Sequence, residues 1–188
     1  MSKKFIFELF RSKKTVFTFQ DIALILNETD ADLLKSKVNY YVKTGMIRAL
    51  RRGVYAKPEY DTWELATHVY SPAYVSFESV LSREGVVFQY YDSIFAASYL
   101  SREIKVDNKR IVFRKIRNSI LVNPEGIISN GNYSYASCER AALDALYLVK
   151  HVDFENKDKI NISKLRELAG IYRSKALENR VKKVFGNG

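Results

Sequence analysis

The sequence is poor in cysteine, histidine and proline for a chain of 188 residues. Cys138 is the only cysteine, so no disulfide can form within the chain, and such usage is typical of a cytoplasmic protein. The two histidines, His68 and His151, lie far apart and make a poor zinc ligand set with a single thiol. We therefore predict a cytoplasmic protein without a disulfide framework, a metal centre or a cofactor.

Long apolar runs and glycine-rich phosphate loops are also missing. The longest apolar run, residues 22–26, is far shorter than the ~20 residues that a membrane-spanning helix needs. We expect no secretory signal, because the N-terminal segment has no apolar central region and no small-residue cleavage site. Neither a Walker-type loop nor a dinucleotide-binding loop occurs. These absences argue against a membrane protein and against the common nucleotide-dependent enzymes.

Positive charge is present in excess and is unevenly placed. The 31 lysines and arginines outnumber the 21 acidic residues, which gives a formal net charge of +10. Residues 1–57 hold 12 basic and 5 acidic side chains, whereas residues 58–135 are close to neutral and residues 136–188 hold 11 basic and 7 acidic ones. The first third is therefore the strongest candidate for binding a polyanion such as DNA.

Residues 29–58, TDADLLKSKVNYYVKTGMIRALRRGVYAKP, predict one helix followed by a hairpin. Thr29 or Asp30 can cap the start of the helix, and Gly45 can end it in a left-handed conformation. Apolar residues at helical spacing give an inner face, which consists of Ala31, Leu34, Val38, Tyr41 and Val42. Two short apolar runs, 47–50 and 54–56, then flank a tip of Arg51-Arg52-Gly53, where glycine can adopt a positive φ.

The opposite face of this helix is polar and basic, and Asp32, Lys35, Ser36, Lys37, Asn39, Tyr40 and Lys43 lie on it or on its flanks. Asn39 can pair with an adenine edge in the major groove, and the lysines can contact guanine or phosphate. The hairpin arginines can reach an adjacent minor groove. The candidate DNA contacts are Lys35, Ser36, Lys37, Asn39, Tyr40, Lys43, Arg51 and Arg52. The alternative is a solvated helix and a charged hairpin in some other small domain.

The upstream segment completes the pattern of a winged helix-turn-helix domain over residues 1–60. A first helix at 4–10 has Phe5, Ile6, Leu9 and Phe10 on its inner face, and an extended piece at 15–17 can pair with the hairpin. Thr18 and Asp21 then form a capping arrangement for a helix over 19–26. Helix, strand, helix, helix and hairpin follow one another in the order of that fold.

Residues 61–188 predict a second, α+β domain, with a small mostly antiparallel sheet packed by helices. Helices are expected at 61–69, at 77–84 with Ser76 as its cap, at 138–150 with Ser137 as its cap, at 163–169 and at 174–184. Strands are expected at 74–76, 94–98, 104–106, 111–116 and 127–128. The last helix carries a basic set of Lys175, Arg180, Lys182 and Lys183. This set is either a partner-binding surface or a solvated face.

Three segments resemble the AbiEi-type antitoxins of type IV toxin–antitoxin systems, in the order found in that family. They are GMIRALRRGVYAKP at 45–58, AYVSFESVL at 73–81 and YASCERAALD at 135–144, although Cys138 stands where a proline is often found. The resemblance implies a non-enzymatic winged-helix repressor that binds inverted repeats in its own promoter. It also implies a C-terminal domain that counters a co-encoded nucleotidyltransferase-like toxin in phage defence by abortive infection, and Lys175, Arg180, Lys182 and Lys183 are our candidates for that contact.

Two other functions remain open from the sequence. The second domain of a winged-helix regulator can instead sense a small ligand. A restriction-type nuclease would place Asp92 near Glu103-Ile104-Lys105 so that two carboxylates hold a divalent cation. Arg140 and Asp144, four residues apart in an apolar helix, are favoured as a structural ion pair over a toxin-facing site. The thiol of Cys138 is expected to be buried and inert.

Overall fold

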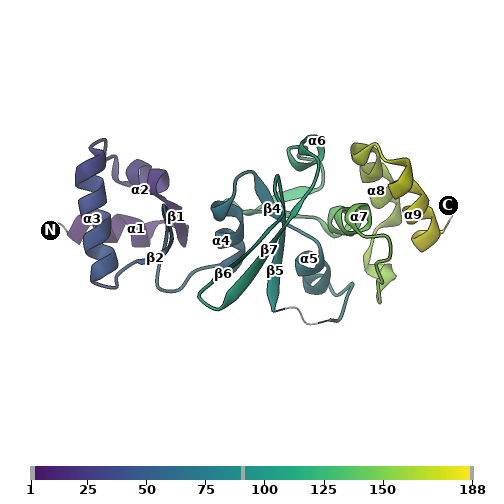
Figure 1. Ribbon diagram of the computed structural model, residues 1–188, viewed down its shortest axis with the longest axis horizontal. Coiled ribbons are helices and arrows are strands. Elements are labelled where there is room, and N and C mark those ends of the chain that lie inside the picture. Colours follow the sequence, from purple (N-terminus) through teal and green to yellow (C-terminus); the bar gives the residue numbers. More distant parts are fainter. Residues whose placement is uncertain (1–2, 90–91, 187–188) are drawn as a thin grey trace.

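The computed structural model describes residues 3–89 and 92–186, and its side chains from Ile6 onward. Figure 1 shows an elongated α+β molecule. A three-stranded sheet with α1 to α3 lies at one end, a six-stranded sheet lies in the middle, and α7 to α9 lie at the other end. Within the described residues no helix is long and apolar enough to cross a bilayer. The general α+β prediction is therefore confirmed.

The N-terminal elements follow the predicted order. They are α1 (Lys3–Arg11), β1 (Val16–Thr18), α2 (Phe19–Leu26), α3 (Ala31–Lys43), β2 (Arg48–Arg51) and β3 (Val54–Ala56). Both neighbouring pairs in the sheet β1-β3-β2 are antiparallel, so the extended piece before α2 does pair with the hairpin. The hairpin turn is shorter than expected, because Arg51 is still in β2 and only Arg52 and Gly53 form the turn.

A small core holds the N-terminal helices on one face of this sheet, and it consists of Leu9, Phe17, Ile22, Leu34, Val38, Tyr41 and Ile47. The predicted burial of two residues is wrong. Ala31 is exposed because it begins α3, one turn before the helix reaches the core at Leu34. Phe10 is 47% exposed, with the ammonium of Lys57 5.6 Å from its ring centre. The prediction for Phe5 lies outside the described side chains.

The second sheet has the order β6-β7-β5-β4-β9-β8. Its strands are β4 (Ala73–Val75), β5 (Ser93–Ser98), β6 (Arg102–Val106), β7 (Lys109–Lys115), β8 (Ile127–Ser129) and β9 (Ser134–Ala136). Three neighbouring pairs are antiparallel, but β5 pairs with β7 and β4 pairs with β9 in parallel, so the sheet is mixed. The reason is that β6 lies outside β7 at the edge, which lets β7 return beside β5 in the same direction.

The remaining helices pack on this sheet or, in the case of α8 and α9, on α7. They are α4 (Thr62–Val69), α5 (Glu78–Arg83), α6 (Asn118–Leu121), α7 (Cys138–Leu148), η1 (Lys157–Lys159), α8 (Ile162–Ala169), η2 (Gly170–Tyr172) and α9 (Lys175–Phe185). Ser137 caps α7 as predicted, because its side chain accepts a hydrogen bond from Arg140 N. The predicted cap of α5 is wrong. Ser76 is buried and donates its hydroxyl proton to Asp144, and Phe77, at a φ of 56°, is the residue that precedes α5.

The two sheets are joined by packing as well as by the chain. Successive residues of a strand point to opposite faces, so Phe17 enters the small core while Val16 belongs to the larger core that includes Leu65 of α4. The buried carboxylate of Glu64 accepts hydrogen bonds from the backbone nitrogen of Thr15 at 2.9 Å and from its hydroxyl at 2.6 Å. The N-terminal sheet is therefore held against α4 at several points.

Candidate nucleic-acid interface

Local sequence explains why α3 begins and ends where it does. The carboxylate of Asp30 accepts hydrogen bonds from Asp32 N and Leu33 N, both at 3.0 Å, which satisfies donors that the first turn leaves free. Gly45 follows the helix at a φ of 72°, a conformation that glycine adopts without strain. The 13-residue helix is thus fixed at both ends, and its outer face has one defined rotation about the core.

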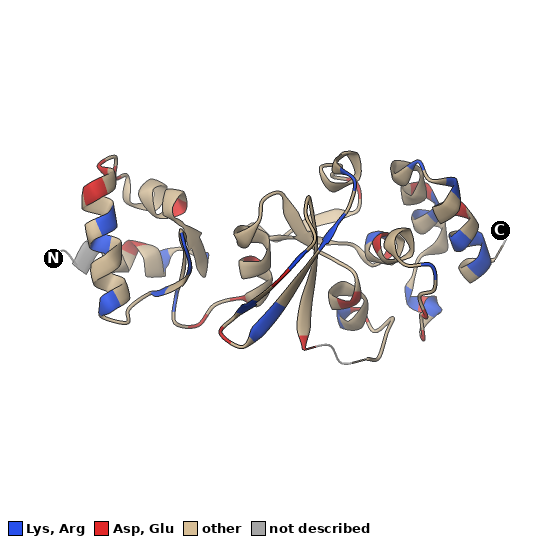
Figure 2. Ribbon diagram, viewed as in Figure 1, with Lys and Arg blue, Asp and Glu red and all other residues tan. Residues whose placement is uncertain are grey.

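The predicted contacts on α3 fall on one exposed stripe. Lys35, Ser36, Asn39, Tyr40 and Lys43 are all exposed, and Tyr40 packs edge-on against the buried Tyr41. Figure 1 places α3 at the end of the molecule, away from the larger sheet, and Figure 2 shows basic residues along it. The helix therefore presents amide, hydroxyl and ammonium groups to solvent without obstruction from the second sheet.

Lys37 differs from the other lysines of α3. Its ammonium lies 2.7 Å from the carboxylate of Glu28 and both side chains are partly buried. Hydrogen bonds from Lys37 and from Asp30 N lower the pKa of Glu28 below its usual value. Lys37 therefore fastens α3 to the preceding turn, and it can reach DNA only by giving up this ion pair.

The hairpin cations are placed unequally. Arg52 is exposed at the turn, and the carbonyl of Gly53 accepts a hydrogen bond from Phe19 N, which ties the turn to the start of α2. Arg51 is half-buried, with its guanidinium 5.7 Å from the ring centre of Tyr70. Arg52 is accordingly the better placed of the two predicted hairpin contacts.

The sequence reasoning missed Arg48, a third cation of the hairpin. Its guanidinium lies 2.6 Å from the carboxylate of Asp107, at the turn between β6 and β7, and 5.9 Å from the ring centre of Tyr60. Burial and the nearby Asp107 raise the pKa of Tyr60 to about 12. An arginine three positions before the predicted tip was a usable signal, but its acidic partner lies 59 residues away and no local pattern indicates it.

The basic set on α9 does not form one face. Lys175 and Lys182 are exposed, whereas Arg180 is half-buried and donates hydrogen bonds to the carbonyls of Leu146 and Tyr147 at 2.6 and 3.0 Å. These carbonyls end α7 and have no partner within that helix. Arg180 thus caps the C-terminal end of α7.

Arg140 and Asp144 lie at the centre of a buried polar network. Both side chains are fully buried, with Arg140 Nε 3.6 Å from Asp144 Oδ1. Asp144 also accepts hydrogen bonds from Tyr172 at 2.6 Å, Ser76 at 2.7 Å and Tyr74 at 3.0 Å. Arg140 donates to the carbonyls of Ile120 and Glu125 and to the hydroxyl of Tyr74. The pair joins four segments of the chain and lies out of reach of a partner protein.

The acidic residue of the candidate nuclease motif is paired with a cation of the same sheet. The carboxylate of Glu103 is exposed and pairs with Arg110 of the adjacent strand at 2.6 Å. Within residues 3–89 and 92–186 no group of three or more histidine, cysteine or acidic residues is placed to hold a metal ion. Burial and the charges of Glu139 and Glu84 raise the pKa of Cys138 to about 12, so its thiol stays protonated at neutral pH.

The chain matches no model of a known protein family and no curated protein. Its candidate site therefore depends on the geometry and charge of its own residues.

Proposed function

We propose that the chain is a sequence-specific DNA-binding repressor, and that its first 60 residues act as a winged helix-turn-helix domain. The observation that carries this proposal is the exposed stripe of Lys35, Ser36, Asn39, Tyr40 and Lys43 on α3. A 13-residue helix is about 20 Å long, which suits a major groove about 12 Å wide. The stripe combines an amide that reads bases with cations that contact phosphate.

The hairpin supports the same proposal. In winged-helix proteins the hairpin reaches the DNA beside the recognition helix. Arg52 is exposed at the turn and is our first candidate for this contact. Arg48 and Arg51 are held by Asp107 and Tyr70, and they would contribute to binding by fixing the orientation of the hairpin.

We further propose that the chain acts as the antitoxin of a type IV system. This part depends on the three motifs that resemble AbiEi-type antitoxins. The positions of α3 and α9 are compatible with an antitoxin that binds both DNA and a toxin, because Figure 2 shows the two helices at opposite ends of the molecule. A protein bound at α9 would therefore leave α3 free for DNA.

Titration of the full-length protein against two duplexes tests the DNA-binding proposal. One duplex carries the DNA upstream of its own gene, and the other has the same base composition in shuffled order. We expect tighter binding to the upstream DNA, and a salt slope of about −4 to −7 in log K against log [salt] for roughly 4–8 phosphate contacts. Equal affinity for both duplexes would refute sequence recognition, and a salt-independent affinity would refute phosphate contacts.

A further inference from the structure

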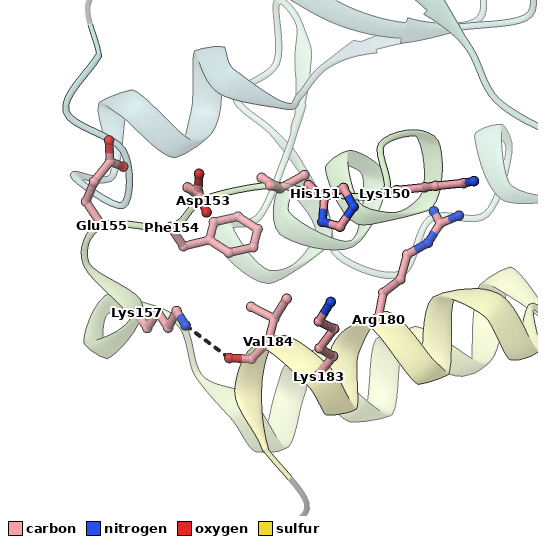
Figure 3. A pocket seen from close by; sticks show the side chains of 10 residues that line it. Lys150, His151, Asp153, Phe154, Glu155, Lys157, Arg180, Lys183 and Val184 are labelled. Atoms are coloured by element: carbon pink, nitrogen blue, oxygen red, sulfur yellow. Dashed lines mark hydrogen bonds between the residues drawn. The ribbon is translucent and has the colours of Figure 1, made fainter.

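A cavity between the segment after α7 and the face of α9 is not accounted for by the proposed function. Its volume is about 300 Å³ (Figure 3). Lys150 and His151 line it from the segment that follows α7, and Arg180 and Lys183 line it from successive turns of α9. The two elements are more than twenty residues apart in the sequence, so the cavity exists only in the folded chain.

The cations around this cavity outnumber its carboxylates, because Lys150, Lys157, Arg180 and Lys183 line it together with Asp153 and Glu155. In the described part of the chain, no carboxylate lies within ion-pair distance of Lys150, Arg180 or Lys183. Figure 3 shows Lys150 and Arg180 reaching toward the same edge of the cavity, while Glu155 lies at the opposite end. Like charges held around one space repel one another, and a bound anion removes that repulsion.

The cavity is also held in shape before any ligand binds. Arg180 is fixed by its hydrogen bonds to the two carbonyls that end α7, which use one terminal nitrogen of the guanidinium. Phe154, only 5% exposed, stacks on Phe185 with ring centres 5.6 Å apart. Lys157 donates a hydrogen bond to the carbonyl of Val184 and so joins the far end of the cavity to α9. A ligand therefore meets a guanidinium, that of Arg180, that is already positioned.

We propose that this cavity binds the phosphate group of a small phosphorylated molecule. Several converging cations favour a phosphate over a carboxylate, because a phosphate offers more acceptor oxygens and up to two negative charges. A space of about 300 Å³ is at the small end of ligand-binding pockets and excludes a folded partner. The shared chemistry is the phosphate itself, which comes either as the free ion or as a monoester in a nucleotide.

Calorimetric titration of the full-length protein tests this proposal with three probes: inorganic phosphate, AMP and adenosine. We expect saturable binding of AMP at physiological chloride concentration and none of adenosine. Equal affinities for AMP and inorganic phosphate would identify the free ion as sufficient, and tighter binding of AMP would show that the nucleoside also makes contacts. Absence of saturable binding by both phosphate-bearing probes, or equal binding of adenosine, would overturn the proposal.

Substitutions locate the site. Lys150→Gln combined with Lys183→Gln should weaken AMP binding at least about tenfold, because each removes a charge-assisted hydrogen bond. Lys182→Gln is the matched control, since Lys182 is an exposed lysine of the same helix that does not line the cavity. Arg180 stays intact because it also caps α7. An equal loss in the control would show a general charge effect and refute the site. The substituted residues lie on α9 or just after α7, and Figure 1 shows both helices well away from α3, so this outcome is independent of DNA binding.

Discussion

Asn39 is the side chain on α3 best suited to distinguish one base pair from another. It lies in the middle of the exposed stripe, with Lys35 one turn before it and Lys43 one turn after it. An asparagine amide can donate to and accept from an adenine edge at the same time, whereas a lysine contacts any phosphate. The stripe therefore assigns base recognition to its centre and phosphate contacts to its ends.

We predict that Asn39→Ala weakens binding to the upstream DNA by about 1–3 kcal/mol and leaves binding to shuffled DNA nearly unchanged. Fluorescence anisotropy with both duplexes measures the difference. Asn179→Ala, an exposed asparagine on α9, is the control and should change neither affinity. An equal loss on both duplexes would show that Asn39 does not read a base.

The buried pair of Arg140 and Asp144 gives a second prediction at the residue scale. Asp144→Ala should destabilise the fold by about 3–5 kcal/mol, because it leaves the guanidinium of Arg140 buried without its counter-charge. Urea unfolding measures the loss, with Asp153→Ala, an exposed aspartate, as the control. Replacing both members with apolar residues, as in Arg140→Met with Asp144→Leu, should recover part of the stability. A loss below 1 kcal/mol for Asp144→Ala would contradict the structural role of the pair.

At the scale of the element, α2 shows how two residues fix the start of a helix. The hydroxyl of Thr18 accepts a hydrogen bond from Asp21 N at 3.0 Å, and the carboxylate of Asp21 accepts one from Thr18 N at 2.8 Å. Lys14 adds an ion pair at 2.6 Å. Burial raises the pKa of Asp21, but the hydrogen bonds from Lys14 and Thr18 outweigh it, and the pKa is lowered from its usual value. The ionised form is therefore the one that the folded state stabilises.

This lowered pKa fixes the direction of a pH effect. The stabilisation is fully present above the pKa of the unfolded chain, near 3.8, and is lost as the pH falls through the lower folded value. Asp21→Asn should cost about 1 kcal/mol at neutral pH. It should also flatten the acid limb of the stability profile, as measured by thermal unfolding between neutral pH and strongly acidic pH. An acid limb as steep as that of the wild type would exclude this role for Asp21.

At the scale of the whole molecule, helix α3, proposed to bind DNA, and helix α9, proposed to bind the toxin, lie at opposite ends of an elongated chain (Figure 1). The N-terminal domain and the rest of the chain nevertheless share packing contacts. The N-terminal sheet contributes Val16, Val54 and Ala56 to the larger core, and Glu64 of α4 receives two hydrogen bonds from Thr15. Removing the first 61 residues uncovers this contact, so the remaining fragment should fold with reduced stability.

The antitoxin proposal predicts a separation of function. Residues 62–188 should fail to bind the upstream DNA and should still restore growth to cells that express the cognate toxin. A variant of this fragment tests whether the basic residues of α9 make the contact. It has four residues changed to alanine, Lys175, Arg180, Lys182 and Lys183, and circular dichroism checks that it folds. A soluble fragment that gives no protection would remove the antitoxin activity from this half. Protection that survives the four changes would exclude α9 as the contact.

The sequence by itself determined most of the local structure, because the signals concerned lie within a few residues of one another. Asp30 and Gly45 bound α3, Thr18 and Asp21 cap α2, and Ser137 begins α7, all as predicted. The exposed stripe on α3 was predictable for the same reason, since helical spacing alone places Lys35, Asn39 and Lys43 on one face.

Only the tertiary structure decided which distant groups meet. Ser76 resembles a helix cap in the sequence, yet its hydroxyl donates a hydrogen bond to Asp144, which lies 68 residues away. Arg51 resembles a free hairpin cation, yet the ring of Tyr70 lies against it. The parallel pairing of β5 with β7 and the cavity shared by Lys150 and Lys183 likewise join segments that no local pattern connects. The physical reason is that burial, ion pairing and strand order depend on which surfaces pack together, and packing is a property of the whole chain.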